Sequence, residues 1–131
     1  MLTPHPGEAA RLLNCSTARV QEDRFAAVRE LQSRYGGTIV LKGCGSLVAA
    51  RDPAVTVCTD GNPGLASGGT GDVLTGVIAG LLAQGLSLES AALTGVCLHG
   101  AAADQAARDG ERGMLAGDLM PWLRRLANPV R

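Results

Sequence analysis

The 131-residue sequence predicts a single domain of the α/β class. Three short runs, at 38–41, 47–50 and 55–58, are typical of strands, and the first, which is β-branched and apolar on successive residues, suits a strand buried on both faces. The longer segments with helical periodicity lie at 21–35, 72–84 and 88–108. One Trp, one Tyr and one Phe leave the core to Ala, Val, Leu and Gly. Small apolar residues of this kind favour helices packed closely on a sheet.

The first segment, Thr-Pro-His-Pro-Gly-Glu at 3–8, holds His5 between two prolines that exclude a helix or a central strand around it. A histidine on so rigid a loop is well placed to contact a ligand, but an ordinary turn has the same pattern, and both readings remain open. A helical turn at 8–13 and a helix at 21–35 follow. The apolar stripe of that helix, which we expect in the core, consists of Phe25, Val28, Leu31 and Tyr35.

The strand at 38–41 leads into Lys42 and a run of small residues, Gly43-Cys44-Gly45-Ser46. Ligands of open α/β sheets bind at the carboxyl ends of strands, so an anion facing Lys42 and the open amides of this loop is one interpretation. The alternative is a surface lysine before a hairpin turn.

A glycine-rich loop, 61–71, runs directly into an apolar helix. The backbone N–H groups of Gly68, Gly69, Thr70 and Gly71 are predicted to form an anion hole at the positive end of that helix. Asp72 would repel a phosphate there unless it had a role, such as taking the proton from a hydroxyl that attacks phosphorus. The alternative is a plain cap of a buried helix. The loop matches neither a Walker nor a dinucleotide motif.

The sequence also predicts how particular residues of the later helices pack and cap. Gly76 and Gly80 each cost about 1 kcal/mol relative to Ala inside a helix, so we expect another element to approach the 72–84 helix closely. His99, in an alanine-rich helix, is expected to be a hydrogen-bonded core residue. Asp118 is expected to cap a last helix, reaching 126 and anchored by Trp122.

Charge and composition exclude several classes of partner. The formal net charge is zero and the charges are scattered, which argues against nucleic acid and anionic membrane surfaces. No apolar run reaches the length that spans a bilayer. The four cysteines show no C-x-x-C spacing and form no ligand cluster with histidine: Cys15, Cys44, Cys58 and Cys97. We therefore predict no dedicated metal site, reduced thiols and a cytoplasmic location.

Three separated motifs together resemble one family. Residues 3–8, Leu41-Lys42-Gly43-x-Gly45-Ser46 and residues 62–72 are similar to the ADP/ATP-dependent NAD(P)H-hydrate dehydratases of the ribokinase-like superfamily. The resemblance covers essentially the whole chain, through Leu98-His99-Gly100. It implies a three-layer α/β/α sandwich. It also implies repair of the S epimer of hydrated NADH or NADPH, in which a nucleotide's terminal phosphate activates the added hydroxyl, which leaves as phosphate and restores the double bond.

The resemblance also implies roles for individual residues. His5 would contact the hydrated dinucleotide, and Asp72 would contact it and act as the base. The nucleotide would be held by Lys42, Gly43, Cys44, Gly45, Ser46 and Gly71. The implied co-substrate is ADP or ATP with Mg²⁺, and ADP is favoured if the source is bacterial.

Two departures from the family affect these expectations. Ser46 stands where the family usually has Thr, and the family's domain is roughly twice as long. Residues 1–131 are therefore expected to be the C-terminal part of one domain, inactive or nearly so alone, and to pair with an N-terminal half or form a homo-oligomer. Two alternative functions are a ribokinase-like kinase of a small alcohol of the thiazole or pyrimidine type and a non-catalytic nucleotide-binding fragment. The motif at 3–8 favours the dehydratase over the kinase.

Overall fold

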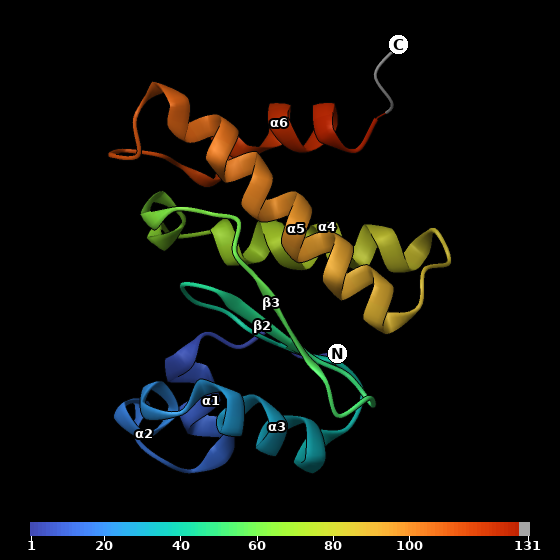
Figure 1. Cartoon of the computed structure of the whole chain (residues 1–131). Helices are drawn as coiled ribbons and strands as arrows, with labels where there is room; N and C mark the ends of the chain where they lie inside the picture. The colour runs from blue at the N-terminus through green and yellow to red at the C-terminus, as the bar shows by residue number, and fades with distance from the viewer. Residues whose placement is uncertain (129–131) are drawn as a thin grey trace.

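The computed structural model describes residues 1–128 and has three layers, with a sheet between two groups of helices (Figure 1). Three helices precede the sheet: α1 (Pro6–Leu13), α2 (Thr17–Glu22) and α3 (Arg24–Tyr35). The strands are β1 (Ile39–Leu41), β2 (Ser46–Ala49) and β3 (Val55–Cys58). Three helices follow: α4 (Thr70–Ala83), α5 (Leu88–Ala106) and α6 (Leu119–Leu126). Short 3₁₀ turns lie at Pro63–Ala66, Ala107–Asp109 and Ala116–Asp118.

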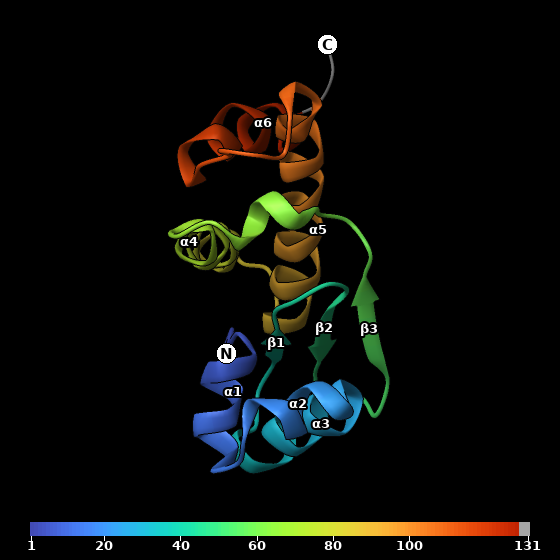
Figure 2. The same cartoon turned by 90° about the vertical axis from the view of Figure 1, so that its left-hand side faces the viewer.

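The three strands form an antiparallel sheet in the order β1-β2-β3, seen side by side in Figure 2. The chain start adds a short parallel segment along β1. Leu2 N–H donates to the Thr38 carbonyl at 3.1 Å, and Val40 N–H donates to the Leu2 carbonyl at 2.8 Å. Because the peptide groups of a strand alternate in direction, the N–H and C=O of Thr3 face away from β1. This leaves an open edge on the N-terminal segment.

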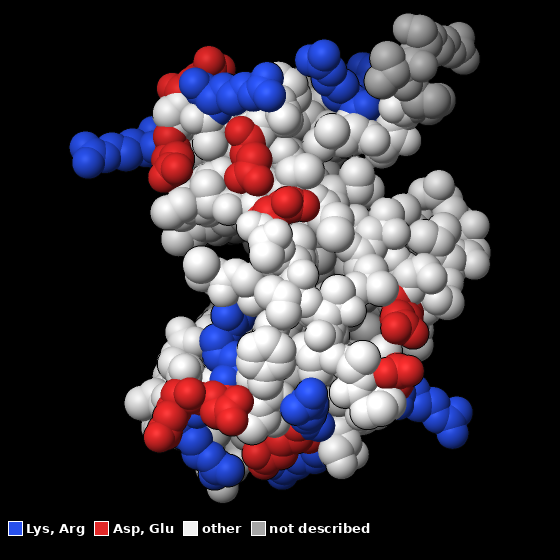
Figure 3. Space-filling model, in the orientation of Figure 1, with Lys and Arg blue, Asp and Glu red and all other residues white. Residues whose placement is uncertain are grey.

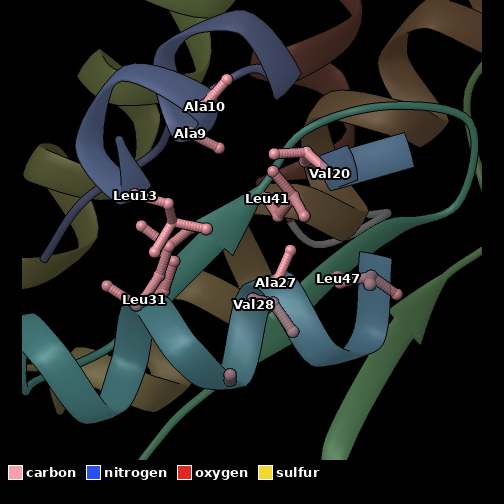
Figure 4. Packing of buried hydrophobic residues seen from close by; sticks show 11 residues of the cluster. Ala9, Ala10, Leu13, Val20, Ala27, Val28, Leu31, Leu41 and Leu47 are labelled. Atoms are coloured by element: carbon pink, nitrogen blue, oxygen red, sulfur yellow. The ribbon is translucent and has the colours of Figure 1, made fainter. Parts of the chain in front are cut away.

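Side chains of β1 and β2 alternate between two apolar cores, so the first strand is buried on both faces as predicted, whereas Thr56 and Val57 of β3 are exposed. On one face Ile39, Leu41 and Leu47 pack against α1, α2 and α3 (Figure 4). On the other, Val40, Val48 and Cys58 pack against α4 and α5. A third cluster joins α6 to α5 and consists of Ala102, Ala103, Met114, Leu119 and Leu123. Among residues 1–128, none of the helices combines the length and apolarity needed to cross a bilayer.

The segment 21–35, expected to be one helix, contains the end of α2 and all of α3. Two of the four residues in its predicted apolar stripe are not buried. The chain breaks at Asp23, whose carboxylate accepts from Ala26 N–H at 2.8 Å and starts α3. Val28 and Leu31 are buried as predicted, but Phe25 and Tyr35 are each 45% exposed. The Tyr35 hydroxyl donates to the Leu12 carbonyl at 2.8 Å, so this ring lies at the rim of the core and ties α3 to α1.

The close helix approach expected at Gly76 and Gly80 occurs at a different glycine. Within residues 1–128, no atom lies within 4 Å of a Cβ built at either position, and both residues are exposed. At Gly95 of α5, by contrast, a Cβ would lie 2.5 Å from Ile78 Cγ1. The small residue that this crossing requires is therefore on α5 rather than on α4.

Two predicted helix starts also need correction. Asp118 precedes α6, but its carboxylate accepts from Leu115 N–H at 2.8 Å and closes the preceding 3₁₀ turn, so it does not cap α6. At the other end of the chain, Pro6 does not exclude a helix. It is the first residue of α1, a position where proline's fixed φ fits and its missing N–H has no helical partner to lose.

Candidate functional site

The loop after β1 and the glycine-rich loop between β3 and α4 lie on the same side of the molecule, at the left in Figure 1. In the same orientation the space-filling view shows a hollow on that side (Figure 3). The three sequence motifs are brought together here by contacts between their side chains and backbone. A separate depression of about 400 Å³ lies among α1, α2 and α3 and contains none of the predicted site residues in its lining.

His5 is the N-cap of α1, and this fixes its ring. The ring Nδ1 accepts from the N–H groups of Gly7 at 3.0 Å and Glu8 at 3.2 Å. The Glu8 carboxylate completes the capping box by accepting from His5 N–H at 2.7 Å. Because Nδ1 is an acceptor, the neutral ring carries its proton on Nε2. His5 is exposed, and its Nε2 lies 3.6 Å from the Glu8 carboxylate, so one ring nitrogen caps α1 and the other faces Glu8.

Lys42 lies between the first and third motifs. Its Nζ is 3.8 Å from the Glu8 carboxylate, and a Cβ at Gly71 would lie only 2.8 Å from the same Nζ. The absence of a side chain at Gly71 therefore lets the ammonium lie against the start of α4. The hydrogen bond from His5 N–H is the main cause that lowers the pKa of Glu8. Burial opposes it with a smaller rise, and the charge of Lys42 lowers the pKa by a lesser amount still. Glu8 thus stays ionised beside Lys42.

The predicted anion hole is accessible. Gly69 is the N-cap of α4, in the left-handed region with φ 85°, and no side chain caps the helix. In the part of the chain that the structure describes, the N–H groups of residues 68–71 donate to no protein acceptor. The Thr70 hydroxyl turns inward, donating to the carbonyls of Leu65 at 2.7 Å and Ser67 at 2.9 Å. Gly68 and Gly69 are exposed, Gly71 is half-buried and Thr70 is buried, so the exposed part of this donor set lies at the two glycines.

Asp72 lies in the first turn of α4 and is exposed. Its own N–H donates to the Gly69 carbonyl at 3.1 Å. Within residues 1–128, its carboxylate accepts no hydrogen bond and forms no ion pair. The side chain is therefore free to take part in chemistry next to the four backbone donors.

His99 is buried, as expected, yet it also contacts the candidate site. Its Nε2 is 2.9 Å from the Thr70 carbonyl. This carbonyl belongs to the peptide group that carries the Gly71 N–H, one of the predicted anion-hole donors. Burial is the main cause that lowers the pKa of His99, and the nearby Lys42 charge adds to this against the opposing effect of the Thr70 carbonyl. The ring is therefore neutral at physiological pH and donates from Nε2 to Thr70.

Two charged residues that the sequence analysis did not single out also support the loops. The Asp104 carboxylate of α5 accepts from Gly61 N–H and from the Asn62 side-chain amide, each at 3.0 Å, and so fixes the start of the glycine-rich loop. Arg24 of α3 donates to carbonyls of the loop that follows β1. In the sequence each is simply a charged residue within a helix, and such residues are far too common to identify these two.

Cysteine spacing also failed to reveal one cluster. The ligand atoms of Cys58, Asp60 and Cys97 lie within 4.8 Å of one another, although the two cysteines are far apart in the sequence. Burial raises the pKa of the Cys58 thiol to about 11. Three potential ligand atoms close together do not by themselves indicate a metal centre. The absence of a dedicated metal site stays a prediction.

The model of the family described as NAD(P)H-hydrate dehydratase matches residues 1–125, which include all three motifs. The chain belongs to this family. A bifunctional NAD(P)H-hydrate repair enzyme of Coxiella burnetii is 58% identical over 98% of the chain and 27% of its own length. An ADP-dependent (S)-NAD(P)H-hydrate dehydratase of Neisseria meningitidis is 50% identical over 99% of the chain and 45% of its own length. The chain thus spans less than half of these dehydratase-family relatives.

Solved structures of the family confirm the fold class. The ADP/ATP-dependent NAD(P)H-hydrate dehydratase of Bacillus subtilis, co-crystallised with ATP/Mg²⁺ and soaked with CoA, superposes with a TM-score of 0.90 at 35% identity. The match covers 96% of this chain and 47% of that one. A ribokinase-like superfamily protein of Enterococcus faecalis superposes with a TM-score of 0.78 at 31% identity, over 98% of this chain and 45% of that one. The predicted ribokinase-like α/β architecture and the family resemblance are confirmed.

Proposed function

We propose that this chain carries the nucleotide-binding and catalytic part of a dehydratase for hydrated NADH and NADPH. The observation that carries the proposal is the contact of Lys42 with Gly71, because it places an ammonium beside four backbone donors that have no protein partner within residues 1–128. This arrangement is suited to the charge of a phosphoryl group in transfer. The names of the matched relatives supply the substrate class.

In the proposed reaction Asp72 takes the proton from the hydroxyl on the hydrated nicotinamide ring, whose oxygen then attacks the terminal phosphorus of ADP or ATP. The bond from that phosphorus to its bridging oxygen breaks, and AMP or ADP leaves. The carbon–oxygen bond to the new phosphate then breaks, phosphate leaves, and the adjacent carbon loses a proton to restore the double bond. The exposed Nε2 of His5 would contact the hydrated dinucleotide. ADP would be the favoured donor if the source is bacterial, and the Neisseria relative is named as ADP-dependent.

The nucleotide fits the residues present. Lys42, Gly43, Cys44, Gly45 and Ser46 would hold it together with Gly71, where the missing side chain makes room for the Lys42 ammonium. Mg²⁺ would neutralise phosphate charge when bound, and it requires few protein ligands because phosphate and water supply most of its oxygens. Asp72 offers a free carboxylate beside this position.

We further propose that residues 1–131 form the C-terminal part of a larger ribokinase-like domain and turn over slowly or not at all alone. The short coverage of the relatives and the open edge at Thr3 support this. The partner would be an N-terminal half or a second copy of the chain. A cytoplasmic location fits its proposed pyridine and adenine nucleotide substrates.

The test joins the chain to the part of the Neisseria relative that it does not match and supplies hydrated NADH with ADP or ATP. We expect the absorbance of the reduced nicotinamide to return. In Asp72→Asn, turnover should fall about 10²–10⁴-fold while nucleotide binding persists, because a general base contributes on this scale. A stable phosphorylated product would instead indicate a kinase, and undiminished turnover in Asp72→Asn would overturn the assigned base.

A further inference from the structure

Arg24, the first residue of α3, reaches from the helical layer to the loop after β1. Its Nη1 donates to the Cys44 carbonyl, and its Nη2 donates to the carbonyls of Leu41 at 3.3 Å and Lys42 at 3.5 Å. One guanidinium therefore binds three backbone carbonyls within the four-residue segment 41–44. The planar fork of arginine suits this arrangement, whereas the compact ammonium of lysine does not.

The loop is shaped to admit this guanidinium. Gly43 has φ 150°, and a Cβ there would lie 2.8 Å from Arg24 Nη2, so a side chain at this position would displace the arginine. Two observations indicate that Arg24 does not stabilise α3 itself. A cation in the first turn is unfavourable with respect to the helix dipole. Its Nε is also buried without a hydrogen-bond partner among residues 1–128.

The consequence for the loop follows from the planarity of the peptide group. In a trans peptide the N–H points opposite to the preceding carbonyl. Because the carbonyls of Lys42 and Cys44 face Arg24, the N–H groups of Gly43 and Gly45 face away from it. Within the described part of the chain, neither N–H donates to a protein acceptor. The arginine thus orients two donors on the opposite side of the loop.

We propose that Arg24 is a positioning residue for the nucleotide-binding loop Lys42–Ser46. It holds the loop backbone from the side of α3, so that the N–H groups of Gly43 and Gly45 are presented together to an anionic oxygen of the nucleotide. Its charge also polarises the peptides whose carbonyls it binds, which strengthens their N–H groups as donors. Arg24 does not itself touch the nucleotide. This inference rests on the proposed function for the identity of the ligand, but not for the ordering of the loop.

The test compares Arg24→Ala and Arg24→Lys with Arg29→Ala, a matched loss of an exposed arginine from the same helix. NMR order parameters of the Gly43 and Gly45 N–H groups should fall in Arg24→Ala from about 0.85 to below about 0.6. The Kd for ATP with Mg²⁺ should rise about tenfold, on the scale of a lost hydrogen bond to a charged group. Arg24→Lys should be intermediate, and Arg29→Ala should match the wild type.

Chemical rescue separates positioning from general stability. Guanidinium ion at millimolar concentration should restore part of the affinity of Arg24→Ala, whereas sodium ion at the same ionic strength should not. Unchanged order parameters in Arg24→Ala, or an equal loss of affinity in Arg29→Ala, would overturn the inference. If the wild type binds no nucleotide, the proposed function fails for this chain, while the order parameters still decide whether Arg24 holds the loop.

Discussion

His99 shows how one buried side chain fixes the backbone of the glycine-rich loop. Its ring donates to the Thr70 carbonyl from within the alanine-rich helix α5, and only 7% of the residue is exposed. The pattern of the sequence predicted its burial correctly. It did not predict the hydrogen-bond partner, because the two residues are 29 positions apart and no local rule pairs them.

The lowered pKa of His99 makes stability depend on pH. The unfolded chain binds a proton at about pH 6.5, whereas the folded chain binds it only at lower pH, so the free energy of unfolding falls as the pH drops below about 6.5. We expect the melting temperature to fall between about pH 7.5 and about pH 5.5, and to fall less in His99→Gln, which keeps a donor without a titrating ring. Thermal unfolding at several pH values measures this. His5→Gln, which removes the other imidazole, is the control and should keep the steeper decline.

The parts of the candidate site formed by the loop backbone and by residues of the three motifs could be predicted from the sequence. Glycine loops have a local signal, so the chain's third motif and Lys42 could be placed before the fold was known. Arg24 and Asp104 could not, because each acts on a loop 17 to 43 residues away through a side chain that any surface could carry. Contacts of this kind exist only once the layers are assembled.

At the level of helices and strands, the apolar pattern predicted where elements lie but not always what covers them. The three strands and α4 to α6 occur close to their predicted positions. The break at Asp23 was missed because residues 21–24 are all polar and give no periodic signal that separates them from the helix that follows, although aspartate is a common helix cap. The close approach predicted at Gly76 and Gly80 was wrong because the free-energy cost of a glycine inside a helix does not reveal whether another element packs against it.

The crossing of α4 and α5 gives a test with a built-in control. Gly95→Ala should lower stability by about 1–3 kcal/mol, because the new methyl would lie 2.5 Å from Ile78 Cγ1 and force the helices apart. Gly76→Ala should raise it by up to about 1 kcal/mol, since the site is open and Ala is the better helix former. Denaturant unfolding of both variants measures the two effects. A destabilised Gly76→Ala would show that α4 is covered in solution.

At the scale of the whole molecule, the open edge along residues 1–4 is the feature that bears on assembly. Thr3 directs its N–H and C=O away from β1, and an unpaired edge of this kind accepts another strand. The hydroxyl of Thr3 is 3.4 Å from that of Thr75, so the edge lies beside an exposed face of α4. A partner that pairs with the edge would therefore also meet this helix.

Removing one donor tests whether the edge mediates association. Thr3→Pro abolishes the outward N–H, so the associated fraction should fall in sedimentation velocity runs at equal concentration. Thr3→Val keeps the N–H and removes only the hydroxyl, and it should associate as the wild type does. A monomeric wild type would show that the edge does not recruit a second copy of the chain.

The order of the layers along the chain has a consequence for biosynthesis. All residues of the core beneath the sheet, from Ala9 to Ala49, precede every helix of the opposite side. Since neighbouring segments make these contacts, the loops to be closed are short and their entropic cost is small. A nascent chain emerging from the ribosome can thus bury this first core while α4, α5 and α6 are still being translated. Until they arrive, Val40 and Val48 remain uncovered, and in that interval the polypeptide would be a natural client for chaperones.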